Sequence, residues 1–264
     1  MNVGLYLIIL IVGLFTTILL SLEAGMRTGR RRAARGAGGS HSGMSAIEGS
    51  IFGLMGLVVA FSFHGAAERF DARRHLIVDE TNIIGTAWLR LDALPAETQP
   101  ALRDLFRRYL DSRLATHRNL LDRKATAAEL DRSAALQEKI WQLAVAATRQ
   151  DGQRTITVVF NALNEMFDIR TTRVMALRQH PPIVVFVMLW FLVCTGGFMA
   201  GHGMAGAGSG RWLHAIAFAA ILSLTAYVIV DMEFPRLGLI RVDSFDVALE
   251  ELRRSMDVPR DAPR

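Results

Sequence analysis

The sequence predicts an all-α integral membrane protein with four transmembrane helices and a helical soluble domain inserted between the second and third spans. The 264 residues are 51% hydrophobic, which is too apolar for a soluble domain of this size. Four stretches without Asp, Glu, Lys or Arg are long enough for a spanning helix of about 20 residues, namely 1–22, 49–67, 179–210 and 212–230. Between the second and third stretches, apolar residues recur every three or four positions, which is typical of amphipathic helices.

The first part of the chain, residues 1–67, is expected to hold two spanning helices joined by a basic loop. The first apolar stretch has no preceding basic residue and exceeds the roughly 7 to 15 residues of a secretion-signal core, so we expect it to remain in the membrane. The loop contains "RTGRRRAARG" at 27–36, and the net charge is +5. Elsewhere the charges alternate in sign, which favours membrane topology over a nucleic-acid partner.

The second helix is expected to continue from lipid into water without a break. Beyond residue 67, a series of residues alternates steps of three and four, the spacing of helices packed in bundles. Its members include Phe70, Ile77, Ile84 and Trp88, which we expect to pack against neighbouring helices. Asn82 lies on a helix that otherwise offers apolar faces. It is expected either to bridge to a neighbouring subunit or to face solvent.

The predicted soluble domain, residues 68–180, contains three more helices. Pro95 and Pro100 end the long helix, since each disfavours helical geometry in the residue before it. A helix to about residue 120 follows, and "TAAE" at 126–129 has the pattern of a capping box at the start of the next. After "DGQ" at 151–153, a last helix is stopped by Pro181 and Pro182.

Residues 181–231 are expected to form the last two spans, and residues 232–264 a tail that packs on the soluble domain. Because "GHGMAGAGSG" at 201–210 is a flexible link, the two spans should be antiparallel. A short helix is expected from about 244 to 256. Pairs of small residues at helical contact spacing let helices approach closely, either within one subunit or between subunits. They are Gly49 with Gly53, and Gly197 with Gly201.

No arrangement of residues points to catalysis, a cofactor or a metal. The Ser, His and Asp residues form no nucleophile motif, and no glycine-rich loop precedes a helix. His64 and His75 have no supporting Cys or carboxylate at ligand spacing, which makes a metal site improbable. We therefore expect a protein that is not an enzyme.

The second span carries the informative residues. Leu57 and Phe61 lie near His64 and Gly53, a mixture that a helix facing only lipid would not need. Arranged around an axis, rings of Leu57 and Phe61 would form an apolar constriction, and a basic ring beyond it could attract anions. Candidates for that ring are Arg69, Arg73 and Arg74. The alternative is that the phenylalanines face lipid, while the arginines contact lipid headgroups or pair with Asp71, Asp79 or Glu80.

The segment "AFSFHGAAERFDARRHLIVDETN" at 60–82 resembles bestrophin channels. In those channels a Gly-Phe pair closes the second transmembrane helix, and an Arg followed by an aromatic comes eight residues after the Phe, as Arg69 and Phe70 follow Phe61 here. "ETNIIGTAWLRLDALP" at 80–95 and "FPRLGLIRV" at 234–242 are similar to bacterial members of the bestrophin-like domain family. Two positions depart from the bestrophin pattern, since Ala60 replaces the glycine of the pair and Asp71 replaces a second aromatic.

The resemblance implies a homo-oligomer, pentameric in bestrophins, that conducts mainly anions through a neck lined by Gly53, Leu57 and Phe61. Its implied partners are membrane lipid, copies of itself and inorganic ions. It also favours a bacterial inner membrane location with the helical domain in the cytoplasm, although the five arginines at 27–36 argue for the opposite orientation. Calcium gating is not expected, because no acidic run is present. Selectivity stays open, since Asp71, Asp79 and Glu80 could favour cations.

The second hypothesis is a non-conducting membrane scaffold or sensor. In that case the spans only anchor the chain, and the helical domain binds a partner protein.

Overall fold

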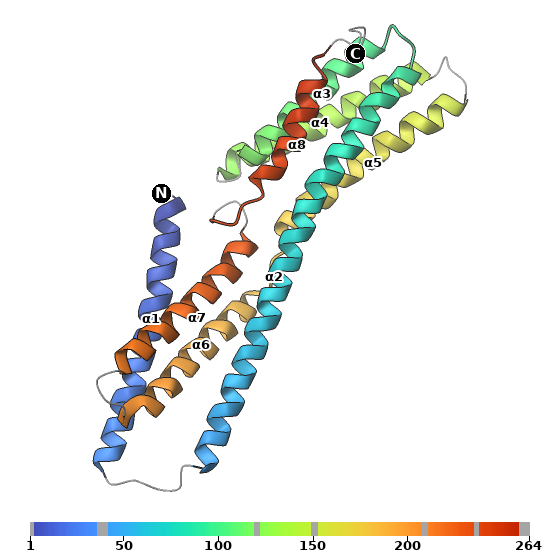
Figure 1. Ribbon diagram of the computed structural model, residues 1–264. Helices are drawn as coiled ribbons and strands as arrows, with labels where there is room; N and C mark the ends of the chain where they lie inside the picture. The colour runs from blue at the N-terminus through green and yellow to red at the C-terminus, as the bar shows by residue number, and fades with distance from the viewer. Residues whose placement is uncertain are drawn as a thin grey trace. The chain divides into compact units, whose positions relative to one another are not determined.

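The computed structural model describes residues 3–35, 42–118, 122–148, 153–206, 211–234 and 238–258 (Figure 1). Their elements are α1 (Val3–Ala34), α2 (Ser42–Arg90), η1 (Leu91–Ala93), α3 (Gln99–Arg118), α4 (Arg123–Thr148), α5 (Gln153–Arg178), α6 (Ile183–Gly203), η2 (Met204–Gly206), α7 (Arg211–Glu233) and α8 (Asp243–Ser255). Within these ranges the all-α prediction is confirmed. Four of the described helices, α1, α2, α6 and α7, are long and apolar enough to cross a membrane.

The chain folds into two compact units. The first comprises Met1–Phe70 and His180–Arg241, and the second comprises Asp71–Gln179 and Val242–Arg264. Helices α1, α6 and α7 belong to the first unit, and α3, α4, α5 and α8 belong to the second. Helix α2 contributes its first part to one unit and its last part to the other. The solubility of the second unit stays a prediction.

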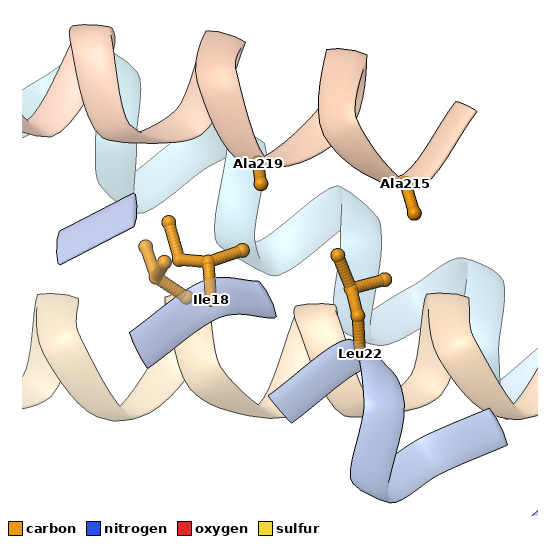
Figure 2. Packing of buried hydrophobic residues seen from close by; sticks show 5 residues of the cluster. Ile18, Leu22, Ala215 and Ala219 are labelled. Carbon is orange, nitrogen blue, oxygen red and sulfur yellow. The ribbon is translucent and has the colours of Figure 1, made fainter. Parts of the chain in front are cut away.

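Small residues let the helices of the first unit approach closely. Ile18 and Leu22 on α1 point toward Ala215 and Ala219 on α7, and all four side chains are almost fully buried (Figure 2). Helix α6 also lies against α1, because a Cβ atom on Gly201 would stand 2.0 Å from the carbonyl oxygen of Leu22. Such contacts hold helices together where apolar burial supplies little drive.

Helix α2 packs on the rest of the first unit through one face only. Met55 is buried against Gly196, where an added Cβ would stand 2.7 Å from the Met55 sulfur. About three helical turns after Met55, Ala66 joins Leu189 and Ile229 in a buried cluster. On the opposite face of α2, Gly53, Leu57 and Phe61 are exposed and are not covered by the described helices of the first unit.

The second unit has a hydrophobic core supplied by all of its helices. Trp88 of α2 lies 6.2 Å from the ring of Phe106 on α3, centroid to centroid, and the guanidinium of Arg103 covers Trp88 at 4.7 Å. The most deeply buried core residues are Ile77, Ile84, Leu91, Leu102, Phe106, Tyr109, Leu110, Ile140, Val159, Leu163, Met166 and Leu249.

The basic segment after the first span is helical as far as Ala34, so the expectation of a loop over 27–36 is wrong for most of its length. Alanine and arginine are good helix formers, and Arg31 and Arg32 stand in the last turn of α1, where positive charge interacts favourably with the helix dipole.

The start of α4 also differs from the prediction. Asp122 caps the helix, since its Oδ1 atom accepts hydrogen bonds from the backbone N–H groups of Lys124 at 2.9 Å and Ala125 at 3.1 Å. The helix thus begins at Arg123, and the capping box predicted at 126–129 lies inside it. An aspartate is as good an N-cap as the threonine of that pattern.

The proline pair before the third span behaves as predicted. Helix α5 ends at Arg178, and α6 begins at Ile183, directly after Pro182, whose φ is −54°. The link expected at 201–210 begins with helical residues, and its last four residues, 207–210, lie outside the described residues. Residues 151–152 and 235–237 also lie outside them, and they include parts of the expected breaks at 151–153 and at Pro235.

The C-terminal tail divides between the units. Residues up to Arg241 belong to the first unit, whereas α8 belongs to the second. Helix α8 packs on α3, where Arg253 pairs with Asp111 at 2.7 Å and Arg107 donates to the carbonyl oxygen of Met256 at 2.7 Å. Only the part of the tail after residue 241 therefore joins the helical bundle.

Candidate functional site

Helix α2 carries a row of exposed side chains, which we call the open stripe. Its positions up to Glu68 belong to the first unit and those from Asp71 belong to the second. Its positions alternate steps of four and three, and each is exposed: Leu57, Phe61, His64, Glu68, Asp71, His75, Val78 and Asn82. The seven steps cover 25 residues, a mean of about 3.6, which is the number of residues in a helical turn, so within each unit these side chains lie on one side of the helix. Gly53, one turn before Leu57, is also exposed.

The N-terminal end of the open stripe is apolar. The exposed fraction is 52% for Leu57 and 67% for Phe61. No atom lies within 4 Å of a Cβ atom built on Gly53 or on Gly49. The predicted neck residues thus share one uncovered face of α2, and Gly49 does not contact another described helix of its own subunit. Their role in a pore stays a prediction.

The open stripe then becomes polar within the first unit. His64 and Glu68 are exposed, and Glu68 forms no ion pair with any described residue. Glu68 follows Phe61 by seven residues, which is a rise of about 10 Å along the helix. The chemistry of the stripe therefore changes from apolar to anionic over two turns.

Arg69 forms a partly buried ion pair, in which its own side chain is 28% exposed. Its guanidinium also lies against Gly65, where an added Cβ would stand 3.1 Å from a terminal nitrogen of Arg69. Its Nε atom donates to the Oε2 atom of Glu233 at 2.8 Å, and Glu233 is only 1% exposed. The other carboxylate oxygen of Glu233 lies 2.9 Å from Nδ1 of His180, whose ring stacks on Phe234 at 4.9 Å. This cluster joins α2, the segment before α6 and the end of α7.

The structure differs from the expected basic patch at Arg73. Its side chain is buried, and its guanidinium donates to the carbonyl oxygens of Ala176 at 3.2 Å and Gln179 at 2.8 Å. Arg74 pairs with Asp71 at 2.8 Å and lies over the ring of Phe245. All three arginines of the predicted patch thus have partners, although the side chains of Arg69 and Arg74 are 28% and 35% exposed.

A family comparison decides what kind of chain carries this stripe. The model of the Bestrophin-like domain family matches residues 14–244, most of the sequence. The chain belongs to the bestrophin-like family. None of the curated proteins compared with the sequence matches it.

Solved structures with the same fold support this assignment. A crystal structure of a bacterial bestrophin homologue from Klebsiella pneumoniae, phased with zinc, is 15% identical, with a TM-score of 0.70, and covers 93% of this chain and 98% of its own. A variant of that homologue is 14% identical over the same shares with a TM-score of 0.71. A structure described as a membrane protein is 15% identical with a TM-score of 0.67. The bestrophin-like fold expected from residues 60–82 is confirmed.

The bestrophin-like chain places the remaining predicted packing residues in two groups. Ile77, Ile84 and Trp88 are buried in the core of the second unit, and Phe70 packs against the cluster that contains Ala66 in the first. Gly197 lies near Ile18 and Ser21, beside the closer contact of Gly201. Asn82 is exposed on the open stripe, where both of its expected roles stay predictions.

Glu80 is placed differently from the expectation that it pairs with an arginine on its own helix. It is fully buried in the second unit, where Oε1 accepts from Nε of Arg113 at 2.6 Å and Oε2 accepts from Arg173. Burial alone would raise the pKa of Glu80, but the two guanidiniums lower it. Glu80 therefore cannot attract ions from solution, which leaves Asp71, Asp79 and Glu68 as the exposed acids of α2.

Sequence reasoning missed the carboxylates at the end of α7. Asp231 is 3% exposed, and its carboxylate accepts hydrogen bonds from the backbone N–H groups of Leu239 at 3.0 Å and Ile240 at 2.8 Å. Glu233 holds Arg69 and His180 as described. The position of these two acids, directly after a stretch without charges, could have indicated them. If such acids are buried, they need polar or charged partners.

The described ranges contain no group of three or more His, Cys, Asp or Glu residues that could hold a metal ion.

Proposed function

We propose that this bestrophin-like chain is a subunit of a homo-oligomeric ion channel whose pore is lined by the open stripe of α2. The observation that carries the proposal is the run of eight exposed positions, whose steps alternate between four and three residues. Among the described residues of each unit these positions are exposed, whereas Met55, Ala66 and Ile77 on other sides of the helix are buried. Membership of the bestrophin-like family supports the proposal.

The chemistry of the open stripe favours a shared axis over exposure to lipid. Steps that alternate between three and four residues occur along the contact seam of helices that pack side by side in a left-handed bundle. A face turned toward lipid would carry Glu68 at the end of the same row as Phe61, and a carboxylate in or near hydrocarbon is costly. If the face is turned toward a water-filled passage, Glu68 stays hydrated, and Leu57 and Phe61 form the apolar part of the passage wall.

The apolar end of the open stripe provides the neck. Rings of Leu57 and Phe61 would narrow the passage and keep it dry when it is closed. Gly53 leaves room one turn before Leu57, because it has no side chain. In this proposal the bulky apolar side chains of Leu57 and Phe61 close the passage.

We further propose five subunits in a bacterial inner membrane, with the second unit in the cytoplasm, as the family resemblance implies. Mass photometry of the solubilised protein measures the subunit number. Five copies support the channel. One or two copies favour a scaffold that binds a partner protein through its helical unit, because a pore lined by one helix per subunit needs more.

The test of the neck is electrical. Purified oligomer in a planar bilayer should give unitary currents, and Phe61→Ala should raise the leak in the closed state because it removes the bulkiest ring from the stripe. Phe63→Ala is the matched control, since Phe63 is 44% exposed but lies off the open stripe. Equal effects of the two substitutions on the leak would contradict the assignment of Phe61 to the neck. Absence of current in several anion and cation solutions would contradict the proposed channel.

A further inference from the structure

The C-terminal end of α1 carries a concentration of positive charge that the proposed channel does not use. We propose that this surface binds the headgroup of an anionic phospholipid. We call it the basic end of α1, and it consists of Arg27, Arg30, Arg31, Arg32 and Arg35. The proposal goes beyond the channel, because it holds whether or not the chain conducts ions.

The charge of the basic end is not balanced by the described part of the chain. Glu23 is the only Asp or Glu among residues 1–47, so five arginines and one glutamate give this segment a net charge of +4. Arg27 pairs with Glu23 at 2.8 Å and is still 68% exposed. The side chains that are exposed and form no ion pair with a described residue are those of Arg30, Arg31, Arg32 and Arg35.

Helix α1 holds these charges close together against their own repulsion. Arg31 lies four residues after Arg27 and four before Arg35, and like charges at this spacing on a helix repel. Gly29 points to the opposite side, because two residues turn the helix by about 200°. There a Cβ atom on Gly29 would stand 2.5 Å from the Cβ atom of Ala205 in η2. The arginines are thus presented by a packed helix, and a bound anion would relieve their repulsion.

Two observations place the basic end at the surface of the membrane. The charge-free part of α1 ends at Leu22, after enough residues for a span of about 20. Leu22 lies beside Ala215 and Ile18 beside Ala219, so α7 runs antiparallel to α1 (Figure 2). Trp212 therefore lies about one turn beyond Ala215, toward the basic end. It is 43% exposed, and tryptophan is enriched at the boundary between membrane and water.

The chemistry of this surface matches a headgroup phosphate. A guanidinium can donate two parallel hydrogen bonds to a phosphate, and its apolar stem can lie along acyl chains. Clusters of four to eight basic residues next to a spanning helix attract anionic lipids, and each residue contributes about fivefold in affinity. Headgroup phosphates already lie at the depth where the arginines begin, whereas a nucleic acid would have to approach from the water side.

Native mass spectrometry of the purified full chain, in the oligomeric state that it adopts, measures the affinity for each added lipid. The protein is titrated with phosphatidylglycerol, which is anionic, and separately with phosphatidylcholine of the same acyl chains, which is zwitterionic. The wild type should bind phosphatidylglycerol at least about 25-fold more tightly. Combining Arg31→Gln with Arg35→Gln should lower the affinity for phosphatidylglycerol by about 25-fold, two factors of about five, and leave that for phosphatidylcholine unchanged.

Two further double variants serve as controls. Arg108→Gln with Arg132→Gln changes the net charge equally, and both arginines are exposed in the second unit, at 50% and 53%. This variant should bind phosphatidylglycerol as the wild type does. Arg31→Lys with Arg35→Lys keeps both positive charges and should retain most of the preference for phosphatidylglycerol.

Equal affinity of the wild type for the two lipids would overturn the proposal, and so would equal losses in the two glutamine double variants. Loss of the preference in the lysine variant would contradict attraction by charge. Displacement of bound phosphatidylglycerol by millimolar inorganic phosphate would assign the surface to free anions and overturn the choice of a lipid. The channel is tested separately, because these measurements need no current.

Discussion

Glu80 is the residue on which the packing of the second unit depends most. Its buried carboxylate accepts hydrogen bonds from Arg113 on α3 and from Arg173 on α5. One side chain of α2 therefore contacts two other helices of the unit. Each of the three side chains is at most 5% exposed. Loss of one member of such a group leaves buried charges uncompensated, which is more costly than the loss of an exposed pair.

Glu80→Gln should therefore lower the free energy of unfolding by about 3 kcal/mol. Denaturant unfolding followed by tryptophan fluorescence measures it, since Trp88 and Trp141 both belong to the second unit. Asp104→Asn is the control, because Asp104 pairs with Arg108 at 3.7 Å on an exposed surface and should contribute less than about 1 kcal/mol. Similar losses for both variants would contradict the central role of Glu80.

The lowered pKa of Glu80 predicts how the stability of the fold changes at acidic pH. Since the two guanidiniums hold the folded-state pKa below the usual 4.5, folding favours the ionised form. Its stabilisation is fully present above pH 4.5 and is lost as the pH falls through the lower folded-state value. The wild type should thus lose more stability than Glu80→Gln between pH 5 and pH 2, a range set by ordinary carboxyl pKa values. Parallel pH profiles of the denaturation midpoint would refute this.

At the scale of elements, the contact between α1 and α6 depends on the absence of side chains. A Cβ atom on Gly25 would stand 1.9 Å from the carbonyl oxygen of Phe198, and one on Gly201 would stand 2.0 Å from that of Leu22. Both obstacles are backbone atoms, which cannot rotate away. The helices must therefore separate if either glycine is replaced.

Gly201→Ala should lower the free energy of unfolding of the solubilised protein by about 1–3 kcal/mol, which is the usual cost of overpacking. Gly203→Ala is the matched control on the same helix, since nothing lies within 4 Å of a Cβ atom built there. Gly203→Ala should change the free energy of unfolding by no more than about 0.5 kcal/mol. Circular dichroism melts in detergent compare the two, and a Gly201 variant as stable as the control would show that the helices can part without loss.

The sequence predicted the elements well where local chemistry decides them. Pro181 and Pro182 cannot continue a helix, and α5 and α6 flank them as expected. The prediction failed at the start of α4, because two capping signals stood within four residues of each other and Asp122 came first. It also failed after the first span, where a run of arginines was taken for a loop although it is compatible with a helix.

At the scale of the whole molecule, the sequence could predict the open stripe but not the partners of the arginines. The spacing of Leu57, Phe61 and Glu68 along α2 follows from the helical period alone. The pairing of Arg69 with Glu233 joins residues 164 positions apart, and that of Glu80 with Arg173 joins residues 93 apart. Such contacts follow from the way helices assemble, so the basic patch expected next to the neck could be corrected only by the fold.

Helix α2 links the proposed pore to the helical unit. Its residues up to Phe70 belong to the first unit, and those from Asp71 belong to the second. The helix contains no proline. The central claim is that one side of this helix, marked by the open stripe, faces a water-filled passage shared by copies of the chain.

A cysteine-accessibility scan of α2 tests that claim most directly. Replacing Cys194, the only cysteine of the chain, with alanine gives a background in which single cysteines are introduced and treated with a charged, water-soluble thiol reagent during current recording. The account predicts that the reagent alters the current at Leu57, Phe61 and His64, and leaves it unchanged at Val58, Ser62 and Ala66. The reverse pattern, or equal effects at both sets, would contradict it.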